Sequence, residues 1–310
     1  MQAFAVKDFS HFLVLIITNY FIGASACKFR PYCYNEGKSR SIPAASFKAE
    51  ENSMEYSVVT RDFSHCHLGV DGDSITQGSQ WSAVVSRILG VASHHNVGVG
   101  SAVWYKRTLE TGGGSVTTQN FTDPDFAGIS DGWLPTDDPV ELQKRANNCA
   151  VVHVQKFIEE VRLHQYAAPD IFMFAMGTND AEDCLGSPEK ALEGKTADAA
   201  DLFTEAGAAR WCIQRILEEY PDCRVFVMLP IQTARPEHNA KLEKTAAVLT
   251  AVAHGMSAQV MDCLHGSGIC EKFEVPDGAG RYLRDGLHPT PKGQELMGRF
   301  AVKELRNNMF

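Results

Sequence analysis

From about residue 64 onward, short apolar runs alternate with longer segments that have the apolar spacing of a helix. The runs span residues 66–70, 96–99, 171–176, 225–229 and 259–261. Two stretches within them, FMFAM and VFVML, are apolar at every position. Continuous apolar runs are typical of parallel strands that are buried on both faces. The pattern therefore predicts five short strands in one covered sheet.

The segments between these runs place their apolar residues on one helical face. Trp81, Val84, Val85, Ile88 and Leu89 follow this spacing, which is the signature of an amphipathic helix. Similar spacing predicts helices within 151–163, 209–217, 242–252 and 294–305. Strands that alternate with helices favour a parallel sheet with helices on both faces. We expect a doubly wound, flavodoxin-like three-layer α/β sandwich with about five parallel strands.

This α/β rhythm defines one predicted domain, residues 61–310, and it is interrupted at about 104–145. The interruption contains Gly112-Gly113-Gly114 and several Asp-Pro steps, and it has no apolar periodicity. Long loops inside compact domains are usually functional or disordered. Because this insert begins directly after the second group of polar residues described below, beside the predicted site, we expect it to shape a substrate site.

The first 26 residues predict a signal peptide. An apolar core, 12–22, is followed by the small residues 23–26, and about 11 residues are too few to span a bilayer. A signal peptide usually begins with a positively charged region, but here the charge of Lys7 is cancelled by Asp8. The alternatives are a buried N-terminal helix and a wrongly assigned start of the gene. Residues 27–60 are polar and aperiodic and predict a linker. We expect a periplasmic, cell-surface or secreted protein, or a cytoplasmic one if the segment is not a signal.

The composition limits the kinds of protein that this chain can be and the partners that it can bind. Of the 310 residues, 44 % are hydrophobic and 22 % charged, and the formal net charge is −9. This is the composition of a soluble globular protein, and the acidic balance argues against binding to nucleic acid. The nine cysteines form no CxxC pair, so a structural zinc site is not expected. Cys263 and Cys270 could pair or remain free thiols.

Polar motifs occur where strands of the predicted sheet end. They are Gly72–Ser74, Gly98–Ser101, Gly177–Asp180 and, before the last helix, Asp285–His288. In an open parallel sheet, ligands bind beyond the carboxyl ends of the strands. The four motifs are therefore expected at one edge of the sheet.

Three of these residues have the chemistry of a nucleophilic hydrolase. A serine hydroxyl is a weak nucleophile until a histidine accepts its proton, and a carboxylate fixes the tautomer of that histidine. Ser74 is the candidate nucleophile, His288 the general base and then acid, and Asp285 its orienting carboxylate. The structural alternatives are a helix-capping serine, a surface histidine and an aspartate in an Asp-Gly turn.

Together the motifs resemble the SGNH hydrolase, or GDSL esterase/lipase, family over about residues 64–305. That family is named for a Ser in GDS, a Gly, an Asn in GxND and a His in DxxH. Here these read Gly72-Asp73-Ser74, the turn 96–101, Gly177-Thr178-Asn179-Asp180 and Asp285-Gly286-Leu287-His288. The resemblance implies ester hydrolysis through an acyl-enzyme, without a cofactor or a metal ion.

An acyl-enzyme mechanism also needs donors for the oxyanion. The Ser74 N–H and the Asn179 side-chain amide are two candidates. The resemblance implies a third in the glycine turn. Family spacing points to Ser101, and Gly100 stands one residue earlier, so the choice between them is open. Asp73, Gly177 and Asp180 are expected to support these loops, the two aspartates by accepting backbone N–H groups.

The substrate is predicted less narrowly than the reaction. Predicted export, the acidic balance and an insert bearing Trp104, Tyr105, Phe121 and Trp133 favour a carbohydrate O-acetylesterase acting on a small-molecule or polysaccharide ester. A lipase or lysophospholipase is the alternative. The oligomeric state is open, and no integral membrane segment is expected in the mature chain.

Two readings from other classes compete with ester hydrolysis. Asp71 and Asp73 have the spacing of the haloacid dehalogenase phosphatases, which need Mg²⁺, but Ile75 stands where that family has Thr or Val. A non-catalytic carbohydrate-binding protein is the other. In addition, 128–132 (GISDG) matches the G-x-S-x-G nucleophile elbow. That motif requires a strand before it and a helix after it, and we reject it because it lies in the polar insert.

Overall fold

A five-stranded parallel sheet forms the centre of the fold. The computed structural model describes residues 62–119, 121 and 127–309; the predicted signal peptide (1–26) and linker (27–60) lie outside them. The strands are β1 (His67–Gly72), β2 (Ser93–Asn96), β5 (Ile171–Ala175), β6 (Arg224–Met228) and β7 (Gln259–Met261), in the spatial order β2-β1-β5-β6-β7. All four pairings are parallel. The predicted doubly wound, flavodoxin-like sandwich is confirmed.

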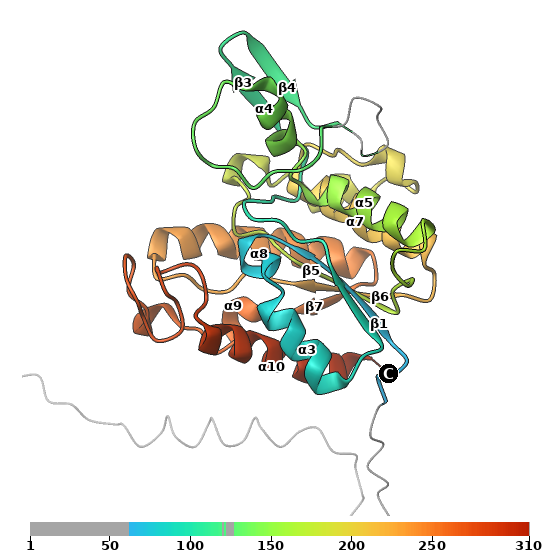
Figure 1. The fold of residues 1–310 in the computed structure, drawn as a ribbon, viewed down its shortest axis with the longest axis vertical. Helices are drawn as coiled ribbons and strands as arrows, with labels where there is room; N and C mark the ends of the chain where they lie inside the picture. Colours follow the sequence, from blue (N-terminus) through green and yellow to red (C-terminus); the bar gives the residue numbers. More distant parts are fainter. Residues whose placement is uncertain (1–61, 120, 122–126, 310) are drawn as a thin grey trace, which may run out of the picture. The chain divides into compact units, whose positions relative to one another are not determined.

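Helices cover both faces of the sheet (Figure 1). On one face lie α5 (Ala150–Arg162), α7 (Glu205–Glu219) and α8 (Pro236–Gly255), and on the other α3 (Gln80–Leu89) and α10 (Pro291–Asn308). Successive strand residues point to opposite faces, so Phe172 and Phe174 join the first core, and Ile171 and Met173 the second. The remaining helices are short: α2 (Ser74–Gln77), α4 (Pro139–Ala146), η1 (Glu182–Cys184), α6 (Pro188–Leu192), η2 (Ala197–Ala199), α9 (Cys263–Gly266) and η3 (Glu271–Phe273).

The order of the strands reverses between β1 and β5. From β1 the chain goes to one side to form β2 and then returns to place β5 on the other side of β1. In doubly wound folds this switch point opens a crevice at the carboxyl ends of the strands, where ligands bind. Ser74 follows β1 and Asn179 follows β5, so both lie at this crevice.

The second strand is displaced from its predicted position. We expected 96–99, whereas β2 ends at Asn96. The side chain of Asn96 accepts the Gly98 N–H at 2.9 Å and so turns the chain there. A Cβ at Gly98 would lie 3.0 Å from the Gly72 carbonyl oxygen, which makes glycine necessary for this close approach to β1.

The insert at 104–145 is not the loop that its glycines suggested. It contains a hairpin of β3 (Thr108–Thr111) and β4 (Gly114–Thr117), and α4 follows. The glycines that interrupt the pattern form the hairpin turn, and Gly114 has a φ of 150°. Asp138 caps α4 by accepting the Val140 N–H at 3.0 Å, with proline at the first helical position. Both are ordinary start signals of a helix.

Close packing of α3 on α10 fixes the C-terminal helix. A Cβ at Gly298 of α10 would lie 2.6 Å from the Trp81 carbonyl oxygen and 2.6 Å from the Val84 Cβ of α3. Only a glycine lets the two helices approach so closely. Because α10 starts three residues after His288, this contact also anchors the loop that carries the histidine.

All seven cysteines in the described part of the chain are free thiols, Cys263 and Cys270 among them. Cys263 and Cys270 are thus not joined in this structure. No helix within 62–309, as far as this range is described, combines the length and apolar character needed to cross a membrane.

Candidate active site

Ser74 lies at a tight turn between β1 and the short helix α2. Asp73 caps α2, its Oδ1 accepting the Ile75 N–H at 3.0 Å. Ser74 is the first helical residue, so its own N–H has no acceptor within the helix. Asp73 is buried, and this burial raises the pKa of its carboxyl to about 6, although the Ile75 hydrogen bond acts in the opposite direction. The turn thus presents both the hydroxyl and the amide of Ser74.

Ser74, His288 and Asp285 form a hydrogen-bonded chain. The Ser74 Oγ lies 3.0 Å from the His288 Nε2, and the His288 Nδ1 lies 2.9 Å from the Asp285 Oδ2. An ionised carboxylate only accepts hydrogen bonds, so the Nδ1 carries the hydrogen and the Nε2 is free to accept from Ser74. The sequence placed these three residues together, and the structure has them in contact.

Asp285 is held as a carboxylate by its surroundings. Partial burial alone would raise its pKa, but hydrogen bonds from the His288 N–H and ring and from the Leu287 N–H hold the pKa at about 2. The Asp285 Oδ1 accepts the His288 N–H at 2.7 Å and the Leu287 N–H at 3.1 Å. One carboxylate therefore orders both the loop and the imidazole.

The turn that follows β2 contains the two candidate oxyanion donors. The Ala102 N–H donates to the Val99 carbonyl at 3.3 Å, with Gly100 and Ser101 between them. Ser101 has a φ of 62°, whereas that of Gly100 is not positive. When only the third of the four turn residues has a positive φ, the turn is of type II, and glycine is preferred at its third position. Ser101 thus occupies the conformation of a glycine.

Asn179 lies against the same turn. Its Nδ2 donates to the Ala102 carbonyl at 3.0 Å, and an amide nitrogen has a second hydrogen left to donate. Gly177, two residues before it, has a φ of 124°, and a Cβ there would lie 2.9 Å from the Thr245 Cγ2. Glycine is therefore required for the chain to turn toward the site.

Asp180 is fully buried beneath this turn and accepts the Trp104 N–H at 2.9 Å. Burial raises the pKa of its carboxyl to about 7, the neighbouring Asp73 charge adds to the rise, and the Trp104 hydrogen bond opposes it. Burial also raises the pKa of the nearby Glu205 well above its ordinary value. Asp180 therefore supports the start of the insert through the Trp104 N–H, and neither carboxyl lines the groove described below.

A groove of about 240 Å³ opens at Ser74 and His288. Its walls include Gln77, Gln80 and Arg284, together with Ile75, Gly78, Pro289 and Gln294. The insert contacts this wall, because the Gln77 Nε2 donates to the Asp131 Oδ2 at 3.0 Å. The groove is thus lined mainly by groups that can hydrogen-bond to a substrate.

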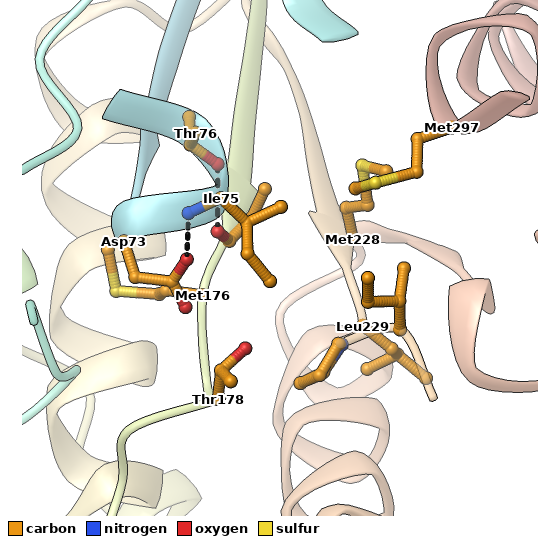
Figure 2. A pocket seen from close by; sticks show the side chains of 11 residues that line it. Asp73, Ile75, Thr76, Met176, Thr178, Met228, Leu229 and Met297 are labelled. Carbon is orange, nitrogen blue, oxygen red and sulfur yellow. Dashed lines mark hydrogen bonds between the residues drawn. The ribbon is translucent and has the colours of Figure 1, made fainter. Parts of the chain in front are cut away.

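Behind the serine turn lies a second, much smaller cavity of about 20 Å³ (Figure 2). Asp73 and Thr178 border it on one side, and Met228, Leu229 and Met297 on the other. Its volume is enough for about one water molecule. No long apolar tunnel therefore extends from the serine into this part of the core.

The aromatic residues of the insert do not form the predicted sugar platform as a group. Trp104 is fully buried and Tyr105 is 8 % exposed, so both are core residues. Phe121 packs partly buried against the same core. Trp133, in contrast, is 80 % exposed. Of these four aromatic residues, Trp133 is the one that is largely exposed, and it lies two residues from the Asp131 that contacts Gln77.

Asp71 does not reach the groove. It is fully buried and pairs with His153, whose Nδ1 lies 2.8 Å from the Asp71 Oδ1. A carboxylate enclosed in this way cannot attack a phosphorus atom, which argues against the phosphatase alternative. Sequence reasoning missed His153 although its context was informative: a histidine inside an apolar helix must find a buried partner.

Ser130 of the G-x-S-x-G motif is engaged elsewhere. Its Oγ donates to the Glu141 Oε1 at 2.6 Å, and it lies in irregular structure between the hairpin and α4. Neither the strand nor the helix that a nucleophile elbow requires flanks it. Within the described ranges, no group of three or more His, Cys, Asp or Glu side chains is arranged to hold a metal ion.

A serine, a histidine and an aspartate are joined by hydrogen bonds at the switch point of a doubly wound sheet, an arrangement that is typical of nucleophilic hydrolases. The model of the GDSL-like Lipase/Acylhydrolase family matches residues 71–296, and this chain belongs to that family. It is accordingly a hydrolase of ester bonds. Among curated proteins, none matches the sequence.

Solved structures share the fold at low sequence identity. A protein from Lactobacillus plantarum is 14 % identical, with a TM-score of 0.52, over 80 % of this chain and 99 % of that one. The lipase/acylhydrolase from Enterococcus faecalis is 16 % identical, with a TM-score of 0.43, over 78 % and 96 %. The first likeness supports the fold and says nothing of the substrate.

Proposed function

We propose that the protein is a serine esterase in which Ser74 carries the acyl group. The observation that carries this proposal is the continuous hydrogen bonding from the Ser74 Oγ through His288 to Asp285. As Ser74 attacks the ester carbonyl, the His288 Nε2 takes its proton and Asp285 stabilises the imidazolium. His288 then protonates the departing alcohol, and a water molecule, deprotonated by His288, releases the acid from Ser74.

The oxyanion formed in each step is bound by three N–H donors in this proposal. They are the unpaired N–H of Ser74, the second amide hydrogen of Asn179 and the N–H of Ser101. The turn conformation supports Ser101 over Gly100, since Ser101 has the positive φ expected where a glycine is usual. Loss of one such donor typically lowers kcat about 100- to 1000-fold.

For the substrate, we propose an O-acetylated carbohydrate. The groove at Ser74 and His288 is lined mainly by polar side chains, and its glutamine and arginine side chains suit a hydroxylated alcohol. Trp133 stands exposed at the insert, where an indole can stack on a sugar ring. A predicted signal peptide at 1–26, which lies outside the described residues, would bring the enzyme to extracellular polysaccharide.

The nucleophile is tested by replacing Ser74 with alanine. Ser74→Ala is expected to reduce the hydrolysis of 4-nitrophenyl acetate by at least about 1000-fold. Ser130→Ala is the matched control, because it removes the serine of the other nucleophile-like motif, and it should retain activity. Full activity in Ser74→Ala would refute the mechanism. Loss of activity on treatment with EDTA would instead favour a metal-dependent enzyme.

The acyl group is tested with 4-nitrophenyl esters of increasing chain length. The acetyl ester should give the highest kcat/KM, and release of acetate from an acetylated polysaccharide should fall in Trp133→Ala. Fastest turnover of long acyl chains would refute the acetylesterase proposal in favour of a lipase or lysophospholipase, and would leave the roles of Ser74 and His288 intact.

A further inference from the structure

A second histidine–carboxylate pair lies buried near the proposed site, and nothing in the triad uses it. The His153 Nδ1 lies 2.8 Å from the Asp71 Oδ1, and the His153 Nε2 lies 3.1 Å from the Asn148 Oδ1. The Asn148 Nδ2 in turn donates to the Gly100 carbonyl at 2.6 Å. None of these three side chains is more than 1 % exposed. Polar groups buried this completely must satisfy one another.

The directions of two hydrogen bonds in this chain follow from its end at Gly100. The Gly100 carbonyl only accepts, so the amide atom of Asn148 that faces it must be the nitrogen. The Asn148 oxygen therefore faces His153, whose Nε2 must carry a hydrogen. On the other side, Asp71 also accepts the Gly72 N–H at 2.8 Å, in the backbone just before the serine turn. The chain thus joins the end of β1 to the turn after β2.

Holding the Gly100 carbonyl also determines where the Ser101 N–H points. The two groups belong to one planar peptide unit, and no described peptide bond is cis. In a trans peptide the C=O and N–H point in opposite directions. Asn148 therefore turns the Ser101 N–H away from the buried network. Among the described residues, no acceptor takes this N–H.

We propose that Asn148, His153 and Asp71 are positioning residues, which fix the Gly100–Ser101 peptide so that the Ser101 N–H is directed at the oxyanion. This inference rests on the ester hydrolysis proposed above and deepens it. It names side chains that never touch the substrate, and it explains why a serine can occupy a position where glycine is usual. The hydrogen bond from Asn148 holds the Gly100–Ser101 peptide in this orientation, so the conformational preference of residue 101 does not have to do so.

The main test is Asn148→Leu, which keeps the branching of the side chain and removes its hydrogen bonds. Active sites are counted by complete reaction with a fluorophosphonate, so that kcat is expressed per reactive serine. We expect kcat for an acetyl ester to fall about 10- to 100-fold, less than for outright loss of a donor, with KM changed less than twofold. The inhibition constant of a boronic acid, which forms a tetrahedral adduct with the serine, should rise in parallel.

A second pair of variants covers the case in which Asn148→Leu does not fold. His153→Gln breaks the link to Asp71 and should lower kcat per site about 10-fold. His95→Gln is the matched control. His95, on β2, pairs with Glu160 of α5 at 3.2 Å and takes no part in the chain from Asp71 to Asn148, so the variant should keep kcat within twofold.

Unchanged kcat per site in the variants of Asn148 or His153 would overturn the inference. So would a lower kcat with an unchanged affinity for the boronic acid. Both results differ from failure of the proposed function itself, which would be seen as full activity in Ser74→Ala.

Discussion

At the scale of single residues, the site depends on which atoms carry hydrogens. Asp285 accepts from the Nδ1 of His288 and so leaves the Nε2 as an acceptor for the Ser74 hydroxyl. The same carboxylate accepts two backbone N–H groups of its own loop. Replacing the carboxylate by an amide separates these two roles. The amide oxygen can still accept the backbone N–H groups of the loop, but the amide NH₂ changes which nitrogen of His288 carries the hydrogen.

Asp285→Asn is expected to lower kcat about 1000- to 10000-fold near neutral pH. The asparagine oxygen can still accept the Leu287 and His288 N–H groups, but its NH₂ faces the Nδ1 and forces the hydrogen onto the Nε2. The imidazole then cannot take the proton of Ser74. Steady-state kinetics with an acetyl ester measures the effect. Asp277→Asn, on an exposed aspartate paired with Arg235 at the surface, is the control, and a loss below tenfold in Asp285→Asn would contradict the assignment.

At the scale of secondary-structure elements, the contact of α3 with α10 fixes the distance between the two ends of the site. Ser74 precedes α3 and His288 precedes α10. Because Gly298 of α10 has no side chain, α10 can pack directly against the backbone and side chains of α3. In an exposed helix, replacing glycine by alanine stabilises by about 1 kcal/mol. At Gly298 the added methyl group has no room, so the same substitution should destabilise the protein.

Gly298→Ala is expected to lower the free energy of unfolding by about 1 to 3 kcal/mol, the usual effect of overpacking a core. Urea denaturation measures the change. Gly113→Ala, at a hairpin glycine with no atom within 4 Å of an added Cβ, should stay near zero. A more stable Gly298→Ala would show that the helices can move apart at little cost.

Much at this scale could be predicted from the sequence, because strands and helices are set by local apolar period. Ser74 follows a strand, and Asp285 and His288 precede the last helix. The hairpin at 108–117 was missed because its consecutive glycines are typical of a loop. Only the pairing of the two flanking segments shows that they form a hairpin turn. The pairing of Asp71 with His153 was missed because it joins residues 82 positions apart. The need for glycine at 298 arises only from the neighbouring helix. Each of these is a property of contacts between distant segments.

At the scale of the whole molecule, buried acids make stability depend on pH. Burial raises the pKa of Asp180 to about 7 and that of Glu205 well above its ordinary value. The Asp73 charge adds to the rise for Asp180, and the Asp180 charge adds to the rise for Glu205. A carboxyl with a raised pKa binds more protons in the folded than in the unfolded state. The free energy of unfolding therefore falls as the pH rises from about 4, the unfolded value, through the folded pKa.

Glu205→Gln removes one of these acids, and the gain in stability should grow with pH. Relative to the wild type, we expect the variant to be more stable at pH 8 than at pH 5 by at least about 1 kcal/mol. Urea denaturation at the two pH values measures this difference. Glu189→Gln, on an exposed glutamate whose pKa is lowered by a hydrogen bond from Ser187, should show no such gain. An equal effect at both pH values would mean that the pKa of Glu205 is not raised in the folded state.

The Ser74–His288 contact joins residues 214 positions apart, which has a consequence for the timing of synthesis. At about 5 to 20 residues per second, the ribosome makes the histidine roughly 10 to 40 s after the serine. In the proposed mechanism, a nascent chain that has not reached residue 288 has a nucleophile without a base, and α10 must still dock on α3. Such a chain is not expected to cleave esters until His288 and α10 have been made.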